Sequence, residues 1–196
     1  EVDIATFLNH DRWLAVAGPQ GCDIWEVEHR RRILQLRGAK FNDIVPITTR
    51  GTMLVACDQG LFLVACQELE RAIGRGSDAV EFPSPSVAAR RLPLPDNESP
   101  KMIARSVDGA VIGVTTVSGG VGVILAETQW QWLAKPGASF RYLAVSHEGR
   151  FLASAEKDNV QTVLWQLAPP QSHWDLSSGE GGRVAFIEVD NQTLLV

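Results

Sequence analysis

Short apolar runs alternate with turn signals along the whole chain. The segment "LAVSHEGRFLASAEKDNVQTVLWQL", residues 143–167, predicts three consecutive strands joined by two tight turns. The best candidate for an amphipathic helix is "CQELERAIGRG", residues 66–76, and its glycines cut the helical pattern short. The pattern therefore predicts an all-β protein.

One order of turn and strand recurs five times. Each copy has a turn that ends in Asp, Gly or Asn, then one linking residue, then an apolar run. The turn anchors are Asp11, Gly51, Gly109, Gly149 and Asn191. Gly and Asn accept positive φ, which suits the tight turn of an antiparallel hairpin. The anchors lie about 40 residues apart with one longer gap, and a period of about 40–45 residues with four strands is typical of a propeller blade.

The repeat predicts where the blades lie. In each blade the second strand is the most apolar and the fourth the most polar, as expected for inner strands buried between neighbours and an outer edge that meets water. The second strands are predicted at Trp13–Gly18, Met53–Cys57, Val111–Thr115 and Phe151–Ala155. The prediction is a single partial β-propeller over residues 1–196, with blades at about 1–39, 40–82, 98–137 and 138–180 and a half-blade at 181–196.

A proline-rich insertion interrupts the repeat at about residues 83–100. Proline removes a donor from the strand ladder, so the stretch 70–100 is expected to form an outer strand and a long exposed loop. A tolerated surface insertion is the simpler interpretation. The alternative is an arm that binds a partner protein through Arg90 and Arg91 and the extended "LPLP" segment.

The fourth unit resembles a WD40 repeat. It has an "SPDG"-like turn, then "LAS", an Asp in the next turn and a Trp near the end of the third strand. By this resemblance, Ser154, Asp158 and Trp165 occupy three positions of the family's hydrogen-bonded tetrad, and Trp25 repeats the tryptophan in the first unit. Residues 137–138 read Gly-Ala where the family has "GH", so the tetrad histidine is missing. The resemblance is therefore to a degenerate WD40-like propeller.

Composition and charge narrow the classes of function. The net charge of −5 and the lack of a clustered basic surface argue against nucleic-acid binding. The basic run at residues 29–32 lies beside Glu26 and Glu28 and is interpreted as a solvated strand end. Neither a membrane span nor a signal peptide is visible. Cys22, Cys57 and Cys66 form no ligand-spaced cluster, and we predict free, buried thiols in a cytoplasmic protein.

Candidate chemistry is sparse. No histidines stand at metal-ligand spacing, and the glycine-rich "SGGVG" at residues 118–122 lies between two strands rather than before a helix. We predict neither catalysis nor a cofactor or metal. Rigid loops at the faces of a propeller suit the docking of proteins. Trp130, Trp132 and Trp174 are therefore candidate partner contacts, although packing of the first two against a neighbouring blade is the favoured interpretation.

Two hypotheses of function remain open. The first is a non-catalytic interaction, scaffold or sensor module of a larger WD40-like protein. The second is a regulatory or substrate-filtering propeller attached to an enzyme such as a peptidase or a signalling ATPase. Because the fifth unit supplies only two strands, we expect the chain to be part of a six- to eight-bladed ring. Further blades from another chain or chain segment are then its first expected partners.

Overall fold

The computed structural model describes residues 4–137, 140–156, 161–169, 171–177, 184–189 and 192–196. Apart from one helix and one 3-10 turn (Thr48–Arg50), its regular elements are strands. The chain divides into two compact units, Glu1–Leu92 and Pro93–Val196.

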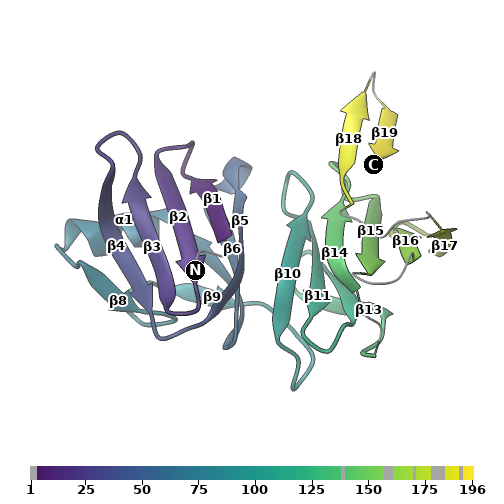
Figure 1. Cartoon of the computed structure of the whole chain (residues 1–196), viewed down its shortest axis with the longest axis horizontal. Coiled ribbons are helices and arrows are strands. Elements are labelled where there is room, and N and C mark those ends of the chain that lie inside the picture. The colour runs from purple at the N-terminus through teal and green to yellow at the C-terminus, as the bar shows by residue number, and fades with distance from the viewer. Residues whose placement is uncertain (1–3, 138–139, 157–160, 170, 178–183, 190–191) are drawn as a thin grey trace. The chain divides into compact units, whose positions relative to one another are not determined.

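The first unit contains two antiparallel sheets, and the first of them receives one extra parallel strand (Figure 1). The strands of the first sheet are, in spatial order, β1 (Ile4–Leu8), β2 (Trp13–Gly18), β3 (Gly21–Glu26), β4 (Arg31–Arg37) and β8 (Ala79–Glu81). Strand β8 runs parallel to β4. The second sheet consists of β5 (Phe41–Ile47), β6 (Thr52–Cys57), β7 (Gly60–Ala65) and β9 (Ala89–Arg91). Helix α1 (Cys66–Gly74) follows β7.

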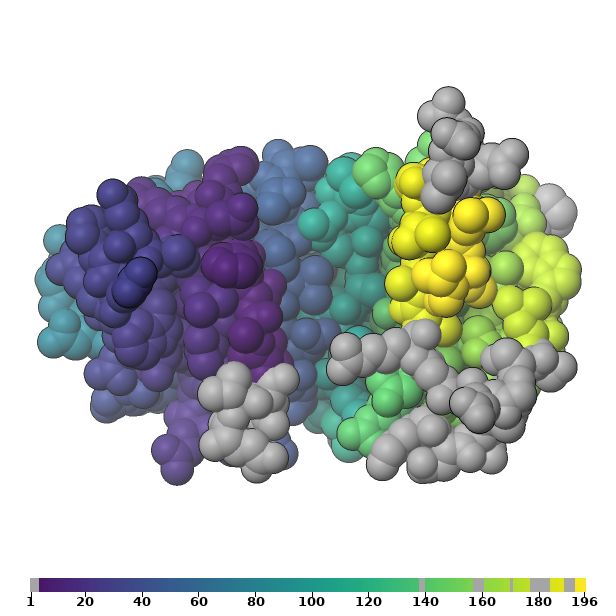
Figure 2. Space-filling view, turned by 45° about the horizontal axis from the view of Figure 1, so that its top comes forward, coloured from purple at the N-terminus to yellow at the C-terminus, as the bar shows by residue number. Residues whose placement is uncertain are grey.

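The second unit repeats this plan with two four-stranded sheets and a hairpin. The third sheet consists of β10 (Pro100–Arg105), β11 (Val111–Thr116), β12 (Val121–Leu125) and β13 (Gln129–Ala134). The fourth consists of β14 (Phe140–Val145), β15 (Phe151–Glu156), β16 (Gln161–Gln166) and β17 (Ser172–Ser177). The hairpin β18 (Phe186–Val189) and β19 (Gln192–Leu195), yellow in Figure 2, lies at the surface.

One backbone hydrogen bond recurs in all four sheets. The N–H that follows the third strand donates to the carbonyl that precedes the second strand: Val27 to Arg12, Cys66 to Gly51, Ala126 to Ala110 and Leu167 to Arg150, at 2.9–3.0 Å. The anchors of the preceding turns share positive φ, at 63° for Asp11, 57° for Gly51, 69° for Gly109 and 70° for Gly149. The predicted second strands and their turns are therefore confirmed; Asn191 lies outside the described residues.

Each unit has a core between two stacked sheets. We call the side of each sheet that carries the first and third residues of its second strand the front face, and the opposite side the rear face. In the first unit the front face of the first sheet packs on the rear face of the second, with Trp13 and Ala15 meeting Met53 and Val55 in one cluster. In the second unit the front face of the third sheet packs on the rear face of the fourth. The stacking direction is therefore the same in both units.

The segment after β7 differs from the prediction of an outer strand and an exposed loop. Residues 66–74 form α1, and its buried side chains, Cys66, Leu69 and Ala72, recur every third position on one face. Gly74 ends the helix rather than interrupting it. The prediction that the glycines cut the helical pattern short is wrong, because this spacing buries one face of the helix before the first glycine is reached.

The proline-rich stretch is also more ordered than predicted. Phe82 is buried, and its ring lies 5.6 Å from that of Phe41 and 5.5 Å from that of Phe62. Short strands on either side extend both sheets, because β8 pairs with β4 and β9 pairs with β7. The insertion therefore contributes to the core of the first unit. The predicted division of the chain into blades, with a single domain over 1–196, stays a prediction.

We expect limited proteolysis to cut first within residues 93–99. Val87 and Leu92 are buried and β9 is paired, so residues 84–92 resist the local unfolding that cleavage requires. Asp96 and Asn97 are exposed in a turn beyond them. Mass spectrometry of the first fragments checks this, and initial cleavage in the turn at residues 117–120 would contradict it.

All three cysteines are free and buried, which confirms the prediction that Cys57 and Cys66 are not bonded to each other. Burial raises the pKa of the Cys22 thiol to about 12, with the nearby Asp23 carboxylate as a smaller cause. Burial also raises the pKa of Cys57 and Cys66. The reactive thiolate is therefore suppressed at all three positions.

The raised pKa values predict that the three thiols are alkylated slowly in the folded protein. At pH 8 a thiol with a pKa of 12 is a thiolate in only about one molecule in ten thousand, compared with about one in four for an ordinary cysteine. Iodoacetamide should label all three thiols in denaturant without reductant, and Cys22 last in the folded chain. Rapid labelling of Cys22 in the folded state would contradict the burial that the structure shows.

Candidate interaction surface

The repeated hydrogen bond defines equivalent positions in the four sheets. The second residue of each second strand lies two positions after the accepting carbonyl of this hydrogen bond. Leu14 of β2 therefore corresponds to Met53 of β6 and Leu152 of β15. Their cross-strand partners are Trp25, Val64 and Trp165, respectively. Sequentially distant residues can therefore be compared one by one on the rear faces.

These rear-face positions are buried in the other three sheets, where Ile112 and Ile124 occupy them in the third, and are exposed to solvent in the first. Met53 and Val64 belong to the core of the first unit, and Leu152 and Trp165 to that of the second. In the first sheet, Trp25 is 36% exposed, and Leu14 is half-buried. Phe7, which pairs with Leu14 from β1, is 51% exposed. An apolar row, Phe7–Leu14–Trp25, thus crosses three strands on the rear face of the first sheet.

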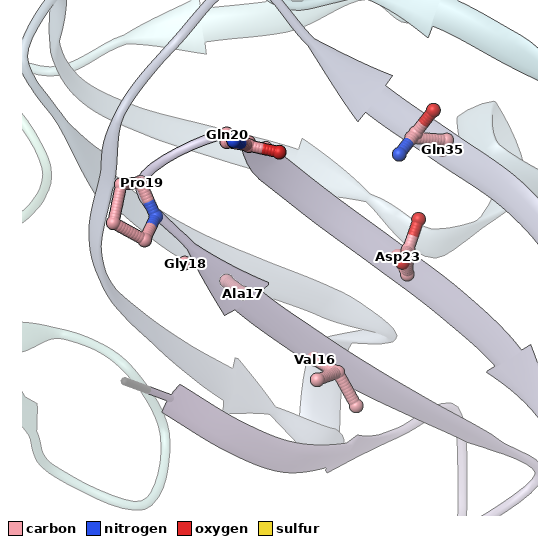
Figure 3. A pocket seen from close by; sticks show the side chains of 8 residues that line it. Val16, Ala17, Gly18, Pro19, Gln20, Asp23 and Gln35 are labelled. Atoms are coloured by element: carbon pink, nitrogen blue, oxygen red, sulfur yellow. The ribbon is translucent and has the colours of Figure 1, made fainter. Parts of the chain in front are cut away.

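A second row on this face is more polar. The registers align Ala5, Val16, Asp23 and Gln35 across β1 to β4. A hollow of about 330 Å³ is lined by Val16, Asp23 and Gln35 of this row and by the Pro19–Gln20 turn (Figure 3). The second and fourth sheets have the buried apolar residues Phe62 and Val163 at the position of Asp23. The rear face of the first sheet is therefore more polar at this position than the rear faces of those two sheets.

The basic run of residues 29–32 is largely neutralised within the sheet. Arg31 donates from Nε to Glu26 at 2.9 Å, and His29 lies 3.0 Å from the same carboxylate. The hydrogen bond from Arg31 is the main reason that the pKa of Glu26 is lowered. Arg32, which pairs with Trp25 across the strands, forms a 3.4 Å ion pair with Asp23. Only the Arg32–Asp23 pair lies on the rear face beside the apolar row, as in the polar rim of an interface, because Glu26 and Arg31 share the front face with Trp13.

The predicted contacts Trp130 and Trp132 pack on their own sheet. Their rings meet edge to face at 5.0 Å, and both are half-buried. The Trp130 ring lies so close to Gly122 that a Cβ there would overlap it, and a Cβ on Gly120 would lie 2.5 Å from Trp132 Cζ3. The glycines of "SGGVG" therefore make room for two indoles, a role that the sequence analysis did not identify.

The other predicted residues lie on the second and fourth sheets. Trp174, on β17, is 44% exposed, and Arg90 and Arg91 lie exposed on β9, where the guanidinium of Arg91 lies beside Gly60. Their proposed role in partner binding stays a prediction.

The residues at the WD40-like positions differ in their burial and in their contacts. Trp165 is buried and meets Phe140 edge to face at 5.8 Å, whereas Trp25 is exposed. The buried hydroxyl of Ser154 has no hydrogen-bond partner within the part of the chain that the structure describes. Asp158 lies outside the described residues.

Two further features bear on function. Within the described residues, no three His, Cys, Asp or Glu side chains come together as a metal-binding group. In the same part of the chain, no helix combines the length and the apolar character that crossing a membrane requires.

Solved structures share the arrangement of stacked four-stranded sheets. The Cps50 (Swd1) beta-propeller domain of Myceliophteria thermophila matches with a TM-score of 0.58 and 14% identity, over 86% of this chain and 52% of that one. Hydrazine synthase of Kuenenia stuttgartiensis matches with a TM-score of 0.67 and 13% identity, over 97% of this chain and 59% of that one. The chain has a β-propeller fold. It spans little more than half the length of either matched propeller chain, and at these identities the likeness concerns the fold alone.

No family model and no curated protein matches the propeller chain by sequence. The function must therefore be argued from its surface.

Proposed function

We propose that this propeller chain is a non-catalytic protein-interaction module of a larger assembly, and that it binds through the rear face of its first sheet. The observation that carries the proposal is the exposed row Phe7–Leu14–Trp25 on a face that is buried in the second and fourth sheets. Large aromatic side chains dominate the energetics of protein interfaces, and contiguous exposed apolar patches mark interaction sites.

The chemistry of the candidate nucleophiles and bases supports the non-catalytic part of the proposal. The thiols are buried with raised pKa values, and His29 is paired with Glu26 at an exposed turn. Free buried cysteines also support a reducing, cytoplasmic compartment.

The test uses the tagged protein as bait in its own cells. The double variant Phe7→Ser, Trp25→Ser removes the aromatic anchors, and Val117→Ser changes an apolar residue that is 63% exposed elsewhere. We expect a protein retained in stoichiometric amount by the wild type and Val117→Ser, and lost at least tenfold by the double variant, because a good aromatic anchor contributes about 2 kcal/mol or more. All three baits must first show the same melting temperature. Retention of the same proteins by all three would reject the proposal.

A further inference from the structure

Two buried hydroxyl groups lie in the core of the second unit. Thr115 of β11 and Ser154 of β15 are both 0% exposed, and neither Thr115 Oγ1 nor Ser154 Oγ has a hydrogen-bond partner among the described residues. Buried polar atoms in native proteins are nearly always hydrogen-bonded, either to the protein or to ordered water. The two hydroxyls therefore indicate a further hydrogen-bonding group beside them.

Strands β11 and β15 run in the same direction across the gap between the third and fourth sheets. A Cβ on Gly149, just before β15, would lie 2.7 Å from Val111 Cγ2. Further along both strands, a Cβ on Gly113 would lie 2.7 Å from Leu152 Cδ1. The contacts thus advance together along the two strands, and the next level of the stack follows from them.

Thr115 and Ser154 occupy this next level and face each other. Thr115 follows Gly113 by two residues on the front face of the third sheet. Ser154 follows Leu152 by two residues on the rear face of the fourth sheet. The side chains next to the two hydroxyls across the strands all lie in or against one apolar cluster: Met102, Val121, Leu143 and Val163.

The first unit has apolar residues at both equivalent positions. Ala17, the fifth residue of β2, corresponds to Thr115, and Val55, the fourth residue of β6, corresponds to Ser154. Both are buried in the core of the first unit. The pair is therefore apolar on both sides in one stack and polar on both sides in the other, which indicates that the two hydroxyls act together.

We infer that one buried water molecule bridges Thr115 Oγ1 and Ser154 Oγ and joins the third and fourth sheets. Stacked sheets lie about 10 Å apart, and two O–H···O hydrogen bonds of about 2.8 Å each suit the distance that two such short side chains leave between them. Val163 lies beside Ser154 where the first unit has the larger Phe62 beside Val55, which provides room. Two hydroxyls, each a donor and an acceptor, meet the minimum of two polar partners that a buried water requires. The site lies in the core of the second unit and does not depend on the proposed interface.

A high-resolution crystal structure of the protein tests the position of the water. We expect density for one water molecule at about 2.5–3.0 Å from both Thr115 Oγ1 and Ser154 Oγ. A direct hydrogen bond between the two hydroxyls, separate protein partners for each of them, or no density between them would overturn the inference.

Urea unfolding of Thr115→Val and Ser154→Ala tests the coupling of the two hydroxyls. Each substitution removes one hydroxyl with little change of volume and leaves the other hydroxyl and the water with one partner fewer, so the equilibrium constant for unfolding should rise about 5- to 30-fold. The double variant is apolar on both sides, as the first unit is, and should be at least as stable as either single variant. Thr128→Val, which removes an exposed hydroxyl, should change the constant less than about twofold. Losses that simply add in the double variant, or single variants as stable as the wild type, would overturn the inference.

Discussion

Leu152→Ala is expected to lower the free energy of unfolding by about 3 kcal/mol, within the range of about 2–5 kcal/mol for Leu truncations in protein cores. Leu152 is fully buried, and it fills the space above Gly113 together with Val145 and Leu143. The truncation therefore leaves a cavity between the third and fourth sheets. Urea unfolding, followed by circular dichroism, measures the loss.

The pairing of Leu152 with Gly113 provides the control. Gly113→Ala alone should cost about 1–3 kcal/mol through overpacking, and the double variant should lose at least about 1 kcal/mol less than the sum of the two losses. Val117→Ala, at an exposed position, should change stability by less than about 0.5 kcal/mol. A loss below about 1 kcal/mol for Leu152→Ala would show that the two sheets do not stack in this register.

Gly122→Ala is the second substitution with a large expected effect. The added Cβ would overlap the Trp130 ring and lie 2.7 Å from its Cε2 atom, so the indole must leave its place over β12. Overpacking of this kind costs about 1–3 kcal/mol, and the edge-to-face contact between Trp130 and Trp132 is disturbed as well. We therefore expect a loss near the upper end of that range, with a changed near-ultraviolet circular dichroism spectrum from the two tryptophans.

A matched substitution separates the clash from a general effect of glycine replacement. Gly74 ends α1 with no atom within 4 Å of an added Cβ, so Gly74→Ala should be neutral or stabilising by up to about 1 kcal/mol. In the Gly122→Ala background, Trp130→Leu should recover part of the lost stability because it removes the ring. Equal effects of Gly122→Ala and Gly74→Ala would mean that Trp130 does not pack on Gly122.

The strands could be predicted because their signals are local. Residues with positive φ, such as Gly51 and Gly149, stand one or two positions before the second strands. The signal for the turn and the signal for the strand are therefore adjacent in the sequence. The short strands β8 and β9 have no such signal, because three residues become a strand only through the neighbour with which they pair. Helix α1 did carry a pattern, in the spacing of Cys66, Leu69 and Ala72.

The candidate surface could not be predicted from the pattern alone. Trp25 and Trp165 stand at equivalent positions in the repeat, yet the first is 36% exposed and the second 7%. Alternation along a strand identifies which residues share a face, but not whether another sheet covers that face. The same limit applies to Gly122, whose role depends on Trp130 of the neighbouring strand.

Hydroxyl-radical footprinting of Phe7 and Trp25 tests most directly whether the rear face of the first sheet is an interface. The oxidation of both side chains is compared between the purified chain and the protein in intact cells, with the exposed Val117 as the reference for radical access. We predict that both aromatic side chains are oxidised readily in the purified chain and are protected several-fold in cells, while Val117 is unchanged. Equal oxidation of Phe7 and Trp25 in the two states would contradict a covered rear face.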